Sequence, residues 1–151
     1  MEGFFDKSSY DWRVFATEHL MAVCAPDAPL ARVKEPQRFE DLLDQHILVR
    51  ERGSGTRAVL EHALAARNLS VESFARVTEI ESVNIIKQFA ASGYGIAFLY
   101  GAAVVCDLEA GTLARIPLAG HLIEHDITFI RPKGSVFGAE YARLFDDLRS
   151  V

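Results

Sequence analysis

The chain has 151 residues, half of them apolar and a quarter charged, with a formal net charge of −5 at pH 7. Such a composition is typical of a globular protein, with enough residues for one domain with a sizeable core or for two small lobes. The negative charge and the lack of clustered Lys and Arg argue against a nucleic-acid-binding surface within these residues, because phosphate contacts need grouped basic side chains.

The sequence shows neither a membrane span nor a signal peptide. No apolar run is long enough to cross a bilayer, and the N-terminus has no basic region before an apolar core. We therefore expect a cytoplasmic protein. Cys24 and Cys106 both sit among apolar neighbours, which predicts two reduced core residues, with a disulfide between them as the alternative.

The hydrophobic pattern predicts strands that alternate with helices along the chain. Extended segments are expected over residues 12–25, 47–49, 76–80, 96–100, 113–118 and 123–131. Helices are expected from Thr56 to Arg67, from Ser82 to Gly93, and over residues 101–109 and 137–149. This alternation is typical of an α/β fold with a largely parallel sheet, in which ligands bind beyond the carboxyl ends of the strands.

Three of these helices carry apolar residues at helical spacing, which predicts the face that packs on the core. The inward residues are expected to be Val59, Leu60, Ala63 and Leu64, then Val83, Ile86, Phe89 and Ala90, and finally Tyr141, Leu144, Phe145 and Leu148. Burial of these side chains is the test of each assignment.

A buried strand, a glycine turn and a helix follow one another over residues 47–67. Such a turn leaves the first N–H groups of the helix without helical partners, and with the helix dipole they favour an anion. Gly53 and Gly55 let a ligand approach the backbone, and Ser54 and Thr56 add hydroxyl groups. The sequence thus indicates a small-anion site, and the alternative is a plain connection in which Ser54 only caps the helix.

A second turn, at Glu81 and Ser82, also follows a predicted strand. In a parallel sheet it lies at the same edge as the turn over residues 53–56, so two helix N-termini would face one cleft. The alternative for Ser82 is capping of its helix alone.

The same glycine turn has a competing interpretation. The pattern Gly53-x-Gly55-x-x-Ala58, followed by Glu79 or Glu81 at the end of the next strand, approaches a dinucleotide-binding fingerprint. Its third position is Ala, and the acidic residue lies further along than the usual ~20 residues. A nucleotide-binding oxidoreductase domain is therefore the alternative hypothesis.

No residue pattern supports catalysis or metal binding. His121 and His125 are four residues apart, but in a segment predicted as loop and strand, so they do not share the helical face of an HExxH site. His19, His46 and His62 lack metal-like spacing, and no nucleophile–base pair is evident. We expect no metal, no cofactor and no enzymatic activity.

Several segments, taken in order, resemble the effector-binding domain of LysR-type transcriptional regulators. The segments that carry the resemblance are residues 26–31, 50–57, 86–88, 93–99 and 108–113, together with the last strand and helix. Ala28 stands where histidine is common in the SPDHPLA segment of that family. The ordered set covers nearly all of the chain.

This resemblance implies a type 2 periplasmic-binding-protein-like α/β fold, in which two lobes joined by crossover strands hold a small effector in their cleft. Residues 18–112 would form a nearly complete second lobe, and residues 1–17 and 113–151 a partial first lobe. Carried over by position, Ser54, Gly55 and Thr56 would be effector contacts from the second lobe, with Ser82 as a further one.

The sequence also departs from the family. We expect that the DNA-binding winged helix-turn-helix, its linker and the first elements of the first lobe are absent, so that this chain does not bind DNA directly. The strand near residues 127–130 would then have an open edge, and the last helix a partly uncovered face. This predicts a homodimer or higher oligomer through residues 123–148, with the helix over 56–67 as a second contact. The alternative is a monomer in which residues 1–10 cover the edge.

We therefore interpret the chain as the small-molecule effector-sensing domain of a LysR-type transcriptional regulator, with a small anion as its ligand. The alternatives are a nucleotide-binding, Rossmann-like oxidoreductase domain and a dimerisation fragment that keeps the fold without a ligand.

Overall fold

The computed structural model describes residues 6–120 and 123–149, which form two compact units. Unit 1 combines Met1–Glu18 with His125–Val151, and unit 2 is His19–Glu124. Unit 2 extends past residue 112 because the strand that follows pairs with its sheet. The equivalence of these units with the two lobes of the family stays a prediction.

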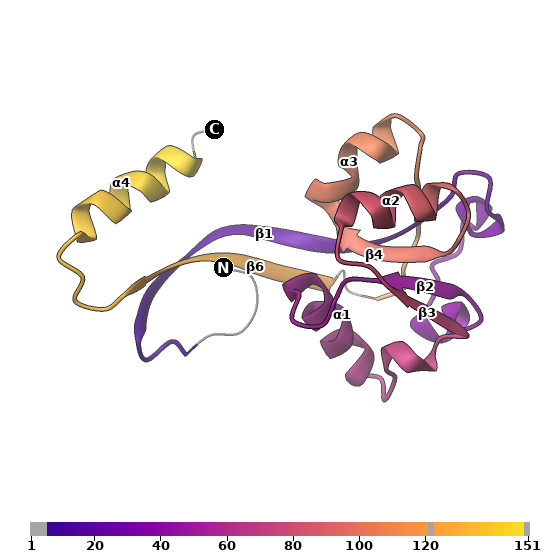
Figure 1. The fold of residues 1–151 in the computed structure, drawn as a ribbon, viewed down its shortest axis with the longest axis horizontal. Helices are drawn as coiled ribbons and strands as arrows, with labels where there is room; N and C mark the ends of the chain where they lie inside the picture. Colours follow the sequence, from indigo (N-terminus) through magenta and orange to yellow (C-terminus); the bar gives the residue numbers. More distant parts are fainter. Residues whose placement is uncertain (1–5, 121–122, 150–151) are drawn as a thin grey trace. The chain divides into compact units, whose positions relative to one another are not determined.

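Unit 2 is built on a sheet whose strands lie in the order β3-β2-β4-β1-β5 (Figure 1). These strands are β1 (Tyr10–Cys24), β2 (His46–Val49), β3 (Arg76–Glu79), β4 (Ile96–Tyr100) and β5 (Ala114–Ile116). β2 pairs in parallel with β3 and β4, whereas β1 is antiparallel to β4 and β5. Four strands therefore run in one direction and β1 runs against them, which confirms the predicted α/β fold.

Helices cover both faces of this sheet: α1 (Gly55–Ala65) lies on one face, and α2 (Val83–Ala91) and α3 (Gly101–Glu109) lie on the other (Figure 1). The alternation of side chains along the strands divides the core accordingly. One cluster joins Ile47 and Val49 to α1, and the other joins Leu48 to α2 and α3. Three short 3₁₀ helices complete the unit, η1 (Pro29–Arg32), η2 (Phe39–Leu42) and η3 (Val71–Ser73).

β4 enters the sheet through a glycine that has no room for a side chain. A Cβ atom at Gly95 would lie 2.5 Å from the carbonyl oxygen of His46, which belongs to the backbone of β2. Because neither strand can move without losing its pairing, this position fixes how closely β4 approaches β2.

Unit 1 consists of the first part of β1, most of β6 (Ile123–Pro132) and α4 (Gly138–Arg149). β6 pairs with β1, and the Thr17 hydroxyl donates to Asp126 Oδ1 at 2.7 Å. Phe145 on α4 is buried, and it meets Phe15 and Phe129 edge to face at centroid distances of 6.0 and 5.6 Å. This aromatic group is the core of unit 1.

Some of the predicted inward residues are exposed. All four apolar residues predicted for the inner face of α1 are buried, but Phe89 on α2 is 40% exposed, and Leu144 and Leu148 on α4 are each 47% exposed. Phe89 packs on the ring of Tyr94 at a centroid distance of 5.2 Å, at the surface. Helical spacing identifies an apolar face, but it does not say how much of that face the fold covers.

The cysteines differ from one another. Both are free; Cys24 is buried as predicted, whereas Cys106 is exposed, so its assignment to the core was wrong. Cys106 lies on α3, whose only buried residue is Val104. No helix of the described residues is both long enough and apolar enough to cross a membrane.

Candidate functional site

The turn after β2 has the backbone geometry that the glycine pattern predicts. Gly53 adopts φ +95°, a left-handed conformation that favours glycine. The Ser54 N–H donates to Glu51 O at 3.2 Å and closes the turn, and the first N–H bonded back along α1 is that of Ala58, which donates to Ser54 O at 3.0 Å. The N-terminal amides of α1 therefore lie at the carboxyl end of β2.

Ser54 occupies the N-cap position of α1, but its side chain makes no capping hydrogen bond. The alternative in which Ser54 only caps the helix is therefore not what the structure shows. Gly55 is the first residue of α1, and Thr56, in the same turn, is buried. The three residues predicted to meet the effector thus form one continuous stretch at the start of a helix.

Ser82 has a structural role of its own. It is the N-cap of α2, and its hydroxyl oxygen accepts a hydrogen bond from the Ile85 N–H at 3.4 Å. This is the capping function that the sequence left open for Ser82. A role in effector binding stays a prediction for this residue.

The topology brings both turns to the same edge of the sheet. β2 and β3 are parallel neighbours, and the Ile80 N–H donates to Val49 O at 2.8 Å, so their pairing continues to the carboxyl ends of both strands. The turn over residues 50–54 leads from β2 into α1, and the turn over residues 80–82 leads from β3 into α2. In unit 2, the N-termini of α1 and α2 therefore follow adjacent strand ends.

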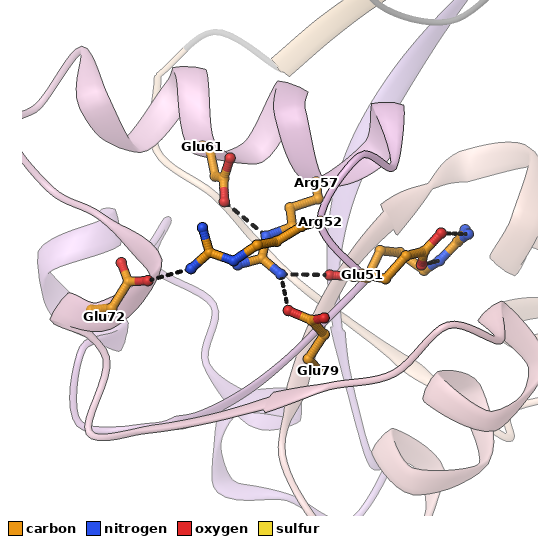
Figure 2. A network of polar contacts seen from close by, with 7 residues as sticks. Glu51, Arg52, Arg57, Glu61, Glu72 and Glu79 are labelled. Carbon is orange, nitrogen blue, oxygen red and sulfur yellow. Dashed lines mark hydrogen bonds and ion pairs between the residues drawn. The ribbon is translucent and has the colours of Figure 1, made fainter.

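A buried arginine ties this edge together (Figure 2). Only 4% of the Arg57 side chain is exposed. Its Nε donates to Glu61 Oε1 at 2.7 Å, and its Nη1 donates to the carbonyl oxygen of Arg50 at 3.0 Å and to the carboxylate of Glu79. Arg57 thus joins α1, the turn after β2 and the last residue of β3.

The electrostatics of Arg57 follow from these contacts. Burial acts against its charge, but the hydrogen bonds to Glu61 and Glu79 outweigh this effect and raise the pKa of Arg57 above its usual value. Sequence reasoning missed this network. The spacing of Arg57 and Glu61, four residues apart on one helix, was the available signal, whereas the contact with Glu79 depends on the sheet.

The other arginines of the turn are also paired with glutamates. Arg50 donates from Nε and Nη2 to the two carboxylate oxygens of Glu51, at 2.8 and 3.0 Å, and this pairing lowers the pKa of Glu51. Arg52 Nη2 lies 3.7 Å from Glu72 Oε1 in a more exposed pair (Figure 2). An anion at this edge would therefore rely first on backbone N–H groups and hydroxyls.

The dinucleotide interpretation placed Glu79 or Glu81 at the end of β3. Glu79 is the last residue of this strand, and its carboxylate accepts a hydrogen bond from Arg57, whereas Glu81 lies two residues beyond the strand. Within the described residues, no group of three or more His, Cys, Asp or Glu side chains is arranged to hold a metal ion. His46 makes a structural contact, with Nε2 2.8 Å from the hydroxyl of Thr78.

Comparison with known families covers the whole chain. The model of the LysR substrate binding domain matches residues 1–151. The chain belongs to this family. Among curated relatives of this LysR domain, the transcriptional regulator CbbR of Cereibacter sphaeroides is 34% identical over 110 residues, which are 73% of the chain. CbbR of Rhizobium meliloti is 37% identical over 101 residues. The LysR domain spans about a third of each of these relatives, 34% and 31%.

Solved structures confirm the fold of the LysR domain. The regulatory domain of Synechocystis CcmR, solved in complex with 2-PG, superposes with a TM-score of 0.84 at 23% identity, over 99% of this chain and 70% of that one. The regulatory domain of MetR from N. meningitidis gives 0.80 at 18% identity, over 99% and 66%. The effector-binding domain of QuiR, in complex with shikimate, gives 0.76 at 15% identity, over 98% and 67%. The predicted type 2 periplasmic-binding-protein-like fold is therefore confirmed.

Proposed function

We propose that this chain is the effector-sensing domain of a LysR-type transcriptional regulator and that it binds a small anionic molecule. The observation that carries the proposal is the turn at Gly53–Gly55, where the start of α1 follows β2 at the carboxyl edge of the sheet. Ligands of parallel α/β sheets bind at this edge, and helix N-termini favour anions there. The small molecules bound to the regulatory domains of CcmR and QuiR support a sensing role for the fold.

Each residue of the proposed site has a defined task. Gly55 and Thr56 supply backbone N–H groups at the positive end of the helix dipole, and Ser54, free of a capping hydrogen bond, supplies a hydroxyl donor. Ser82 would add a hydroxyl hydrogen from the neighbouring turn, because its oxygen accepts from Ile85 while its hydrogen can still be donated. Arg57 fixes the position of the turn through its hydrogen bonds to Arg50, Glu61 and Glu79, and in this proposal it does not contact the ligand.

Thermal shift with a panel of sulfate, small carboxylates and nicotinamide nucleotides tests the proposal. A bound anion stabilises the fold by RT ln(1 + [L]/Kd), so weak ligands must be screened at millimolar concentration. Ser54→Ala should abolish the shift without lowering the stability of the free protein, since its side chain makes no cap. Ser92→Ala is the matched control, because Ser92 lies at the C-cap of α2, away from the helix N-termini of the proposed site. Stabilisation by nucleotides alone would favour the oxidoreductase alternative, and an unchanged shift in Ser54→Ala would remove Ser54 from the site.

The proposal includes a role in transcription rather than catalysis. CbbR of both organisms is named as a transcriptional regulator. A transcriptional regulator works in the compartment that holds the DNA, so we expect a cytoplasmic protein. We also expect its DNA contacts to lie outside these residues. At a net charge of −5 the chain should not shift random duplex DNA in a gel at physiological salt. Tight binding that weakens with salt would contradict this part of the proposal.

We also propose that the domain assembles as a homodimer or higher oligomer through residues 123–148, with α1 as a second contact. Two exposed residues of α4, Leu144 and Leu148, and Val136 and Phe137 just before it, support this assignment. In the monomer alternative residues 1–10 cover the edge, and residues 1–5 of that segment lie outside the described residues. Light scattering after gel filtration measures the mass directly. A monomer at tens of micromolar, with the amide of Ile127 protected from exchange, would reject the oligomer.

A further inference from the structure

Unit 1 contains a cavity of about 120 Å³ that the proposed effector site does not use. It is lined by residues of α4, β1 and β6, all of them within unit 1. A cavity of about 150 Å³ with an apolar lining can hold a benzene molecule. This pocket is smaller than that but open to solvent, so its scale is at most that of a single six-membered ring.

The apolar part of the lining is aromatic and firmly held. Phe145 is buried and lies edge to face against Phe129, with interplanar angle 78°. Phe15 also meets the Phe145 ring edge to face, with an interplanar angle of 84°. Tyr141 and Trp12 complete the aromatic lining. A planar ring in the cavity would meet the faces or the edges of these side chains. Aromatic pairs prefer edge-to-face or offset-stacked contacts, and both are open to such a ring.

The polar part of the lining is positively charged. Arg13 and Arg131 line the cavity together with a single carboxylate, that of Asp11, which leaves a net charge of one positive unit. Asp11 lies 3.1 Å from Arg131 Nη2. A Cβ atom at Gly138 would lie 2.7 Å from Arg131 Nη1, so the glycine leaves room for this guanidinium at the start of α4.

Arg13 is the cation that a ligand could recruit. Its Cζ lies 3.9 Å from the centroid of the Phe145 ring, so the guanidinium makes a cation–π contact with that ring. Its ion pair with Asp146 is long, 3.9 Å, and both side chains are exposed. Such exposed pairs contribute little free energy in water, so little stability is lost when an incoming anion replaces Asp146.

We propose that this cavity is a second ligand site, and that it binds a small aromatic carboxylate. The ring would lie among Phe129, Tyr141 and Phe145, and the carboxylate would accept hydrogen bonds from Arg13. Arginine pairs with planar carboxylates through two parallel hydrogen bonds, and a monoanion that replaces Asp146 beside Arg13 keeps the balance of charge at that arginine. The site shares no residue with the proposed effector site. It overlaps the segment 123–148 proposed for assembly, but the exposed Leu144 and Leu148 of that segment do not line it.

The intrinsic fluorescence of Trp12 can report binding at this site. Trp12 is the only tryptophan among the 151 residues, and it lines the cavity. Titration of the full chain with benzoate should change the Trp12 fluorescence in a saturable manner. Benzyl alcohol keeps the ring without the charge, and acetate keeps the charge without the ring, so each should bind at least tenfold more weakly, as expected when a charge-assisted hydrogen bond or the apolar contact is lost.

Variants separate this site from other causes of a signal. Arg13→Gln should raise the Kd for benzoate roughly 10- to 100-fold, because it removes a charged hydrogen-bond donor. Arg143→Gln makes the same change at an exposed position of α4 that does not line the cavity, and it should leave the Kd unchanged. Ala142→Leu fills the space and should abolish binding. Ser54→Ala should leave benzoate binding intact, which distinguishes this site from the proposed effector site.

Three results would overturn the proposal. One is the lack of any saturable change with benzoate up to tens of millimolar. Another is equal binding of benzoate and benzyl alcohol, which would remove the carboxylate from recognition. The third is an equal effect of Arg13→Gln and Arg143→Gln. The comparison of the three probes uses the unaltered chain, so it decides the question even if a variant does not fold.

Discussion

Replacement of Arg57 by methionine should destabilise the fold far more than the same change at Arg52. Methionine keeps most of the aliphatic length of arginine but removes every hydrogen bond of the guanidinium. In Arg57 those bonds reach Glu61, the carbonyl of Arg50 and Glu79, from a side chain that is 4% exposed. Arg52 has one pair, at 3.7 Å, with side chains 77% and 66% exposed.

The magnitude follows from the exposure of the partners. Breaking a fully buried ion pair costs about 3–5 kcal/mol, because an unpaired charge stays buried. Here the charge left behind belongs to Glu61 and Glu79, whose side chains are 46% and 47% exposed and are solvated by water. The loss is then that of a few hydrogen bonds to a charged group, and we expect about 2–3 kcal/mol. For a chain of this size that lowers Tm by roughly 4–12 °C.

Urea and thermal unfolding, followed by far-UV circular dichroism, measure the difference between the two variants. Arg52→Met should change the free energy of unfolding by at most about 0.5 kcal/mol. Arg57→Lys should fall between wild type and Arg57→Met, because it keeps the charge but loses the planar set of donors. Equal losses in Arg57→Met and Arg52→Met would refute the reasoning, since they would show that burial and bond geometry at Arg57 add nothing.

Three further outcomes follow from the structure. At pH 8 an aromatic disulfide reagent should titrate Cys106 in the native protein and reach Cys24 only after unfolding, because burial raises the pKa of Cys24 to about 11. Serine hydrogen bonds lower the pKa of Asp6 to about 2. Together with other carboxylates whose pKa is depressed by folding, Asp6 should make stability fall as the pH drops from about 4.5 towards 2, whereas acid unfolding above pH 5 would contradict it. Gly95→Ala should lower the free energy of unfolding, measured by urea titration, by at least about 2 kcal/mol, because its Cβ would lie 2.5 Å from the carbonyl oxygen of His46.

Much of the fold of unit 2 was predictable from short-range patterns. The run Ile96–Tyr100 lies between glycines and is apolar throughout, and both the strand and the helix after it, Gly101–Glu109, end where the sequence indicates. The core face of α1 was also predicted correctly. Its apolar residues recur at helical spacing, and the sheet of unit 2 covers all of them. In α4 the same reasoning identified Phe145 but wrongly placed Leu144 inside. Spacing predicts which residues share a face, whereas burial depends on the neighbours that the fold supplies.

The candidate site was predictable only in its backbone. The glycine turn and the helix start after it are local, so Gly53 and Ser54 lie where the pattern predicts. The contact of Arg57 with Glu79 joins residues 22 positions apart, and it exists because β2 and β3 are parallel neighbours. The cavity of unit 1 depends on both ends of the chain, and no local pattern indicates it. Side-chain networks that cross strands need the sheet before they can be predicted.

Because the chain crosses between the units twice, we expect unit 2 to fold before unit 1. Unit 2 is a continuous stretch of chain whose ends meet, with His19 Nδ1 3.7 Å from Glu124 Oε1. Unit 1 is built from the two remaining ends, and pairing them first would require closing a loop as long as the whole of unit 2. Once unit 2 has formed, the entropy of closing that loop is already lost, and β1 and β6 can pair without losing it again. On the ribosome unit 1 must wait for residues 125–149 to emerge, and a nonsense mutation after residue 124 deletes the larger part of unit 1 but no strand of the β3-β2-β4-β1-β5 sheet.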